Sequence, residues 1–231
     1  MKILLSLLAL GIAVIIPVFF EELLALFVTK LSAGWVFSTI YIRILVIIFF
    51  AVFLNLLFSN FEKTRKIKFW VVFLIAIVPG FGLSFISPIY EGDYGYVQKE
   101  DLPQLNIEQL KEATQDQLEI EKEYEIIAFF TSTCPHCMST SKKLGMNISA
   151  GQEIPVTAMF PGDKASAEGF LSANGGEAFT YFVIEGEPFA MNAGGSFPST
   201  FLVNKKGETV NHWRGDVLNY SALDHLLSLE P

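Results

Sequence analysis

The sequence contains only two cysteines among its 231 residues, and both lie in the tetrad Cys134-Pro135-His136-Cys137. With a single closely spaced pair, the chain cannot build a disulfide framework between distant segments. A structural zinc site needs about four ligands, and beyond His136 only His212 and His225 could add to the pair. A structural disulfide remains an alternative, but a loop of four residues removes little chain entropy. The tetrad therefore favours redox chemistry.

Internal repeats, low-complexity tracts, a P-loop and a dinucleotide-binding glycine motif are also missing from the sequence. Residues 1–88 carry seven Lys or Arg and three Asp or Glu, whereas residues 89–231 carry nine and 21, so that the overall net charge is −8. A basic N-terminal region followed by an acidic C-terminal region argues against nucleic acid as a partner.

Hydrophobic residues make up 52% of the chain, and the mean hydropathy is +0.44. The excess lies in three apolar stretches near the N-terminus, at about 3–20, 36–58 and 69–87. Each is long enough to cross a bilayer as a helix, so residues 1–88 are predicted to form a helical transmembrane region of about three spans. Two readings stay open for residues 23–41: an external amphipathic segment, or a fourth span interrupted by Lys30.

The orientation of the predicted spans in the membrane follows from the short segment 60–68 between the second and third apolar stretches. It holds Lys63, Arg65, Lys66 and Lys68, and loops rich in positive charge stay in the cytoplasm. The third span then runs outward, so everything after Pro88 is expected outside. The predicted location is the bacterial inner (cytoplasmic) membrane, with a multi-pass topology and an extracytoplasmic C-terminal domain.

A connector is predicted at 89–105 because its residues show no hydrophobic periodicity, and a folded domain at 106–231. In that domain strand and helix patterns alternate, then end in a hairpin and a final helix. Helices are expected at 106–123, 138–148, 164–173 and 220–229, and strands at 124–131, 154–160, 179–184, 200–204 and 208–213. The predicted fold class is an α/β sandwich preceded by the transmembrane helices.

The tetrad follows a predicted buried strand and opens a predicted helix. At a helix N-terminus the free N–H groups favour a thiolate, so Cys134 is the expected nucleophile. Pro135 suits the first helical position because it lacks an N–H group. His136 adds positive charge or a hydrogen bond beside Cys134, which makes a disulfide more oxidising. Cys137, one turn into the helix, is expected to resolve the mixed disulfide.

A second motif is Gly194-Gly195-Ser196-Phe197-Pro198, directly before a predicted strand. Paired with the upstream tetrad, it resembles the thioredoxin superfamily, over roughly 123–229. The resemblance implies a thioredoxin-like fold in which Pro198 is cis and packs against the dithiol. It also implies that Phe197 offers backbone hydrogen bonds to a substrate strand, so that Phe197 and Pro198 form the substrate-binding loop.

Within that superfamily the run from Phe197 to Glu208 (Phe-Pro-Ser-Thr-Phe-Leu-Val-Asn-Lys-Lys-Gly-Glu) is similar to the membrane-anchored TlpA/ResA-like branch, as is Trp213-Arg214-Gly215. The long spacing from the tetrad to Pro198 suggests that branch's inserted element, around 161–192. The Cys-Pro-His-Cys tetrad instead resembles DsbA-type oxidases. Oxidant and reductant roles therefore both stay open, and the longer scaffold match slightly favours a reductant.

One position departs from the family. Many thioredoxin-like proteins carry a buried acid six residues before the first cysteine, where this chain has Ala128. That acid helps to move the proton of the inner cysteine. Glu125 or Glu187 are candidates to replace it from elsewhere in the fold.

The leading hypothesis is a membrane-anchored, extracytoplasmic thiol–disulfide oxidoreductase that needs no metal and no organic cofactor. Its expected partners are protein thiols and disulfides, together with a membrane-embedded redox partner, because residues 1–88 contain no cysteine to relay electrons. The alternative is a binding module for copper delivery, or an assembly scaffold, built on the same fold. A copper site would need a histidine near the dithiol, and His212 is expected to be a structural or a surface histidine instead.

Overall fold

A computed structural model describes residues 2–59, 69–86, 94, 102–215 and 218–229 of the chain. It divides the protein into two compact units, Met1–Tyr90 and Glu91–Pro231. The basic segment 60–68 and most of the connector 89–105 lie outside the described residues.

Four helices make up the first unit: α1 (Lys2–Val18), α2 (Phe20–Leu31), α3 (Trp35–Phe58) and α4 (Phe69–Ser84). Among the described residues only α3 is long and apolar enough to cross a membrane alone, and α1 and α2 pass that test together as a pair bent by 76°. The α4 helix, with 16 residues, is shorter. Length and composition therefore support one or two spans, against about three in the sequence prediction. Residues 23–41 are not one span, because the chain breaks between α2 and α3 at Ser32, which has a φ of 51°.

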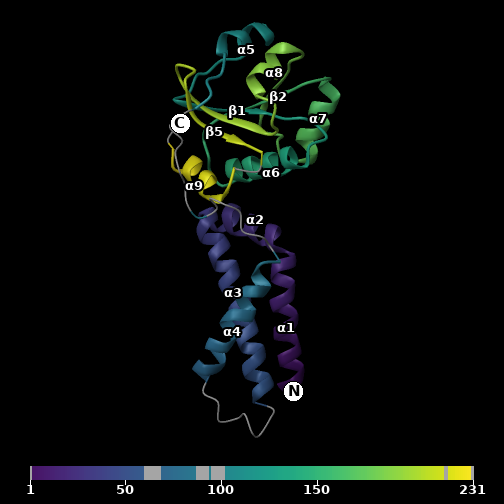
Figure 1. Cartoon of the computed structure of the whole chain (residues 1–231), viewed down its shortest axis with the longest axis vertical. Coiled ribbons are helices and arrows are strands. Elements are labelled where there is room, and N and C mark those ends of the chain that lie inside the picture. The colour runs from purple at the N-terminus through teal and green to yellow at the C-terminus, as the bar shows by residue number, and fades with distance from the viewer. Residues whose placement is uncertain (1, 60–68, 87–93, 95–101, 216–217, 230–231) are drawn as a thin grey trace. The chain divides into compact units, whose positions relative to one another are not determined.

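Inside this unit α1 and α4 both pack against α3 (Figure 1). Arg43 of α3 is buried; its Nη1 donates to the carbonyl of Ser84 at 2.7 Å, and its guanidinium lies 5.2 Å from the ring centre of Phe20. These contacts place a charged side chain inside the helix bundle and tie α3 to the end of α4 and the start of α2.

Five strands form one mixed sheet in the second unit, in the order β3-β2-β1-β4-β5. The strands are β1 (Tyr124–Phe129), β2 (Val156–Phe160), β3 (Thr180–Val183), β4 (Ser199–Asn204) and β5 (Thr209–Arg214). The first three run parallel, whereas β4 is antiparallel to both β1 and β5. Every residue of β1 after Tyr124 is buried, as expected for a central strand.

Helices cover both faces of this sheet (Figure 1). One face carries α5 (Ile107–Ala113) and α8 (Glu187–Ala193), and the other carries α6 (Pro135–Ser149) and α9 (Tyr220–Ser228); α7 (Lys164–Ala173) connects β2 to β3. Beneath α5 and α8 lies a core that includes Leu110, Phe129, Phe189 and Phe201. This arrangement fits the thioredoxin-like α/β fold that the sequence resemblance implies.

The prediction of a helix over 106–123 was wrong in its length. The cap is where it was expected, since Asn106 Oδ1 accepts the N–H of Gln109 at 3.1 Å. The helix nevertheless ends at Ala113, because Gln115 and Asp116 take positive φ values of 56° and 58° and turn the chain back. Leu118 is then buried in the core from a segment that is not helical.

Candidate active site

The tetrad sits where the central strand ends and α6 begins. Cys134 is the N-cap residue of α6, with extended φ and ψ of −85° and 117°, and Pro135 opens the helix. The Cys134 Sγ accepts the N–H of Cys137 at 3.3 Å, so one of the free donors at the helix start points at the sulfur. A negative charge on Cys134 is therefore stabilised by the helix itself.

The two thiols differ sharply in exposure. Cys134 is partly exposed, whereas Cys137 is buried with 0% of its surface accessible. Burial first, and then the hydrogen bond with Cys134, raise the pKa of Cys137 to about 12, while hydrogen bonds with the backbone and side chain of Thr131 act in the opposite direction. The geometry makes Cys134 the accessible thiol and keeps Cys137 protonated behind it.

His136 is exposed at the second position of α6. The contacts of the Cys134 Sγ within the described residues are the Cys137 N–H and the carbonyl of Phe197. The imidazole is not among them, and a direct role for His136 at the sulfur stays a prediction.

The second predicted motif, which contains Phe197 and Pro198, lies beside the tetrad. The Phe197–Pro198 peptide bond is cis, as the resemblance implied. The Cys134 thiol donates to the carbonyl of Phe197 at 3.8 Å, and Pro198 is buried beside it. Its own carbonyl accepts the N–H of Gly215 at 2.8 Å, which ties this loop to the end of β5. The sheet order, the helices on both faces and the cis-proline loop beside the tetrad fit a thioredoxin-like α/β fold.

Comparison with known proteins finds no matching family model and no matching curated protein. Among solved structures, similar chains include a secreted Mycobacterium tuberculosis disulfide oxidoreductase described as homologous to E. coli DsbE (13% identity, 46% of this chain and 81% of that chain, TM-score 0.39). StoA from Bacillus subtilis is 22% identical over 46% of this chain and 84% of its own, with a TM-score of 0.37. A thioredoxin-like protein from Bacteroides caccae is 12% identical over 85% of this chain and 78% of its own, with a TM-score of 0.35.

The helix α8 was not predicted from the sequence. It supports the cis-proline loop. The ring of Phe189 stacks on Phe197 at 5.6 Å with an interplanar angle of 15°, and also meets Phe129 of the central strand edge-on at 5.6 Å. Because Phe129 is in the core, this chain of rings fixes the side chain of the residue whose carbonyl meets Cys134. The sequence signal is the Glu187-Pro188 pair, since proline favours the first turn of a helix.

Of the two acids that were considered as substitutes for the one missing at Ala128, Glu125 lies on the other face of the sheet from that position. Ala128 is fully buried, and side chains alternate across a strand, so Glu125 of β1 points to the opposite face. Glu187 is exposed at the start of α8. Thr131, which sequence reasoning missed, acts through its backbone and side chain against the raised pKa of Cys137.

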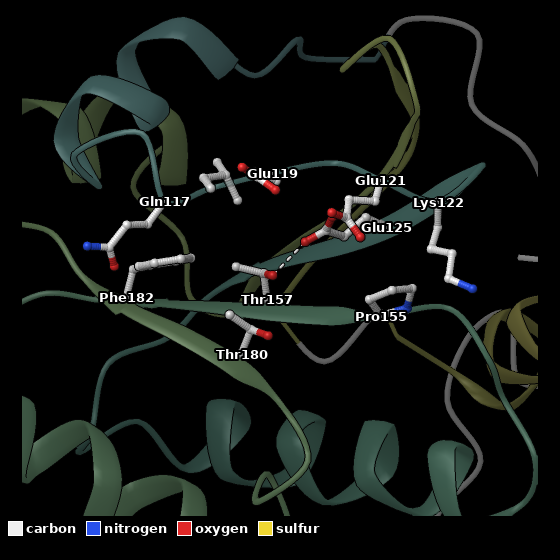
Figure 2. Close-up of a pocket in the computed structure, with 10 residues that line it drawn as sticks. Gln117, Glu119, Glu121, Lys122, Glu125, Pro155, Thr157, Thr180 and Phe182 are labelled. Atoms are coloured by element: carbon white, nitrogen blue, oxygen red, sulfur yellow. Dashed lines mark hydrogen bonds between the residues drawn. The ribbon is translucent and has the colours of Figure 1, made fainter.

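Glu125 instead faces a cavity of about 260 Å³ on the α5 side of the sheet (Figure 2). Its carboxylate is 4% exposed and accepts a hydrogen bond from the hydroxyl of Thr157. Burial, and secondarily the charge of Glu121, raise the pKa of Glu125 above its usual range, while the bond from Thr157 opposes that shift. Glu119 and Lys122 also line the cavity. Across the described part of the chain, no three His, Cys, Asp or Glu residues converge in a way that could hold a metal.

His212 is buried on β5, as a structural role predicts. Its Nε2 lies 2.9 Å from the hydroxyl of Ser199, and its ring stacks on Phe201 at 4.1 Å. One of its two ring nitrogens is therefore engaged inside the domain.

We expect Thr131→Val to slow alkylation of Cys137 about tenfold, because a hydrogen bond to a charged group contributes roughly 1.5–3 kcal/mol. The reaction is followed at neutral pH with a small alkylating reagent in a Cys134→Ser background. Valine keeps the shape of threonine but cannot donate to the thiolate. Thr133→Val, at an exposed position in the same turn, is the matched control and should leave the rate unchanged. Equal rates for the two variants would show that the Thr131 hydroxyl does not stabilise the thiolate.

Glu125→Gln is expected to raise the melting temperature at pH 7 and to have no effect near pH 4. Since the pKa of Glu125 is raised in the fold, its neutral form contributes stability that is present below the ordinary value and lost as the pH rises through the raised one. Glutamine stays neutral and keeps the acceptor for Thr157. Glu119→Gln, an exposed change at the same cavity, is the control. A lower melting temperature for Glu125→Gln at pH 7 would contradict the burial argument.

Proposed function

We propose that this chain is a membrane-anchored thiol–disulfide oxidoreductase that exchanges the Cys134–Cys137 pair with cysteines of other proteins. One observation carries the proposal: a partly exposed thiol at a helix N-terminus contacts the carbonyl of a cis-proline loop, with a buried thiol directly behind it. A purely structural disulfide does not need an accessible sulfur that contacts the carbonyl of a neighbouring loop.

The exchange proceeds in two displacements. The Cys134 thiolate attacks one sulfur of a substrate disulfide, forming a Cys134–substrate disulfide and releasing the other substrate sulfur as a thiolate. Cys137 loses its proton and attacks the Cys134 sulfur, so that the first substrate cysteine leaves as a thiolate as well. The substrate gains two electrons, and Cys134 and Cys137 end as a disulfide. Phe197 and Pro198 position the substrate backbone beside the reacting sulfur.

The reductant direction is favoured for this pair. An oxidising couple requires strong stabilisation of the reduced form, which His136 was expected to supply. In the described region the hydrogen bonds donated to the Cys134 sulfur come from Cys137 rather than from the imidazole of His136. A high pKa of Cys137 likewise leaves the inner thiol poorly stabilised as an anion. A membrane-embedded electron donor is then needed to return the disulfide to the dithiol.

The proposed location is the bacterial inner membrane, with about three spans in residues 1–88 and the catalytic domain outside. The length and apolar character of α3 support a membrane anchor. The four positive charges between Lys63 and Lys68 support a cytoplasmic position for that segment.

The redox proposal is tested with the full chain in detergent micelles and a peptide disulfide as substrate. Cys134→Ser should abolish exchange, because no other thiol is accessible at the site. Cys137→Ser should still attack but accumulate the Cys134–peptide disulfide, which mass spectrometry detects. Equilibration of the unmodified protein with glutathione gives the direction: a potential near or below about −230 mV marks a reductant, and one near about −120 mV an oxidant. Absence of any exchange would overturn the enzyme proposal.

The topology is tested with reporters that are active on only one side of the membrane. Alkaline phosphatase fused after Pro231 should be active, because its disulfides form only outside the cytoplasm. The same reporter fused after Lys66 should be inactive, and a fluorescent protein that folds in the cytoplasm should give the reverse pattern. An active phosphatase after Lys66 would contradict the proposed orientation.

A further inference from the structure

Arg214 is the last residue of β5 and is paired in register with Ser199, the residue that follows the cis-proline. Directly paired residues of antiparallel strands lie about 4.5–5.5 Å apart at Cα. The next N–H along the chain, that of Gly215, donates to the carbonyl of Pro198. The backbone of Arg214 is thus held against the loop that contacts Cys134.

The side chain of Arg214 lies over the turn that leads into this loop. A Cβ atom at Gly194 would stand 2.9 Å from its Nη2 and 3.7 Å from its Cζ, so the guanidinium occupies the space that the missing side chain leaves. Gly194 also has a φ of 70°, which favours glycine. Both features favour glycine at this position and leave the guanidinium at the start of the turn that leads to Phe197 and Pro198.

The guanidinium keeps its hydrogen-bonding capacity. Arg214 is exposed, and within the part of the chain that the structure describes it makes no hydrogen bond or ion pair. It is also the only arginine after Arg65 in the sequence, in a region where acidic residues outnumber basic ones by 21 to nine. A planar fork of donors at this position suits a carboxylate, which it can bind through two parallel hydrogen bonds.

From this placement we infer that Arg214 is a specificity-determining residue, which recognises an Asp or Glu next to the reacting cysteine of the protein substrate. The inference rests on the proposed exchange reaction and names the substrate class for it. The acidic domain as a whole repels acidic chains, so a preference for them must come from a local cation such as Arg214. A purely structural role is the alternative, since a positive charge near the C-terminus of α8 also stabilises that helix.

The test uses the full reduced chain in detergent micelles and three peptides that differ only in the residue beside a single cysteine: Asp, Asn or Lys. Each peptide cysteine is joined by a disulfide to a coloured aryl thiol. Attack of Cys134 on the peptide sulfur releases that thiol as a thiolate and forms the Cys134–peptide disulfide. Each reduced chain reacts once, so the ratio of the second-order rate constants for the Asp and Asn peptides measures recognition of the carboxylate. Two peptide sets place the variable residue before or after the cysteine.

We expect an Asp-to-Asn ratio of about three to five in one of the two sets, the size of a well-placed exposed ion pair. Arg214→Gln should bring that ratio to about one, Arg214→Lys should retain part of it, and Arg214→Glu should favour the Lys peptide. Lys206→Gln, which removes an exposed cation from the β4–β5 turn, is the control for general charge and should keep the ratio.

A ratio of one in both sets for the unmodified protein, or a ratio that survives Arg214→Gln, would overturn the inference and leave the exchange reaction standing. Loss of helix stability in Arg214→Gln with no change in the ratio would assign the residue to the structural role. Failure to react with any peptide would overturn the proposed function and this inference with it.

Discussion

The pairing of Phe129 with Ser199 between β1 and β4 decides where the two motifs of this domain meet. The central strand ends just before the tetrad, and the neighbouring strand begins just after the cis-proline. Because the two strands are antiparallel, the last residue of β1 and the first residue of β4 lie at the same end of the sheet. A shift by one residue would turn every side chain of β4 to the other face, and the carbonyl of Phe197 would no longer meet Cys134.

At this end of the sheet the two cysteine side chains have opposite properties. Cys134 caps α6, where an N–H group faces its sulfur, while Cys137 lies one turn further in and is sealed from water. The helix start stabilises an anion at the surface and burial disfavours one in the interior. One short segment therefore supplies the accessible thiol and the buried thiol that the proposed exchange uses.

Much of this could be predicted from the sequence because the signals are local. A buried strand, two cysteines, a proline at the first helical position and a glycine-rich turn before Pro198 each have a direct structural consequence. The end of α5 could not be predicted, since Gln115 and Asp116 carry no signal for the positive φ values that they adopt. The support of the loop by Phe189 and the contact of Thr131 with Cys137 depend on elements that meet only in the folded chain.

The replacement of a buried acid by Ala128 has a consequence for the inner thiol. A carboxylate at that position would change its charge with pH, and its negative charge would disfavour a second anion on Cys137. A threonine hydroxyl donates to the thiolate and does not titrate at physiological pH. With Glu125 on the opposite face of the sheet, the reactivity of Cys137 depends on its burial and on the hydrogen bonds of Thr131. In the proposed exchange, the resolving step would then be governed by the ionisation of the thiol itself rather than by that of a neighbouring acid.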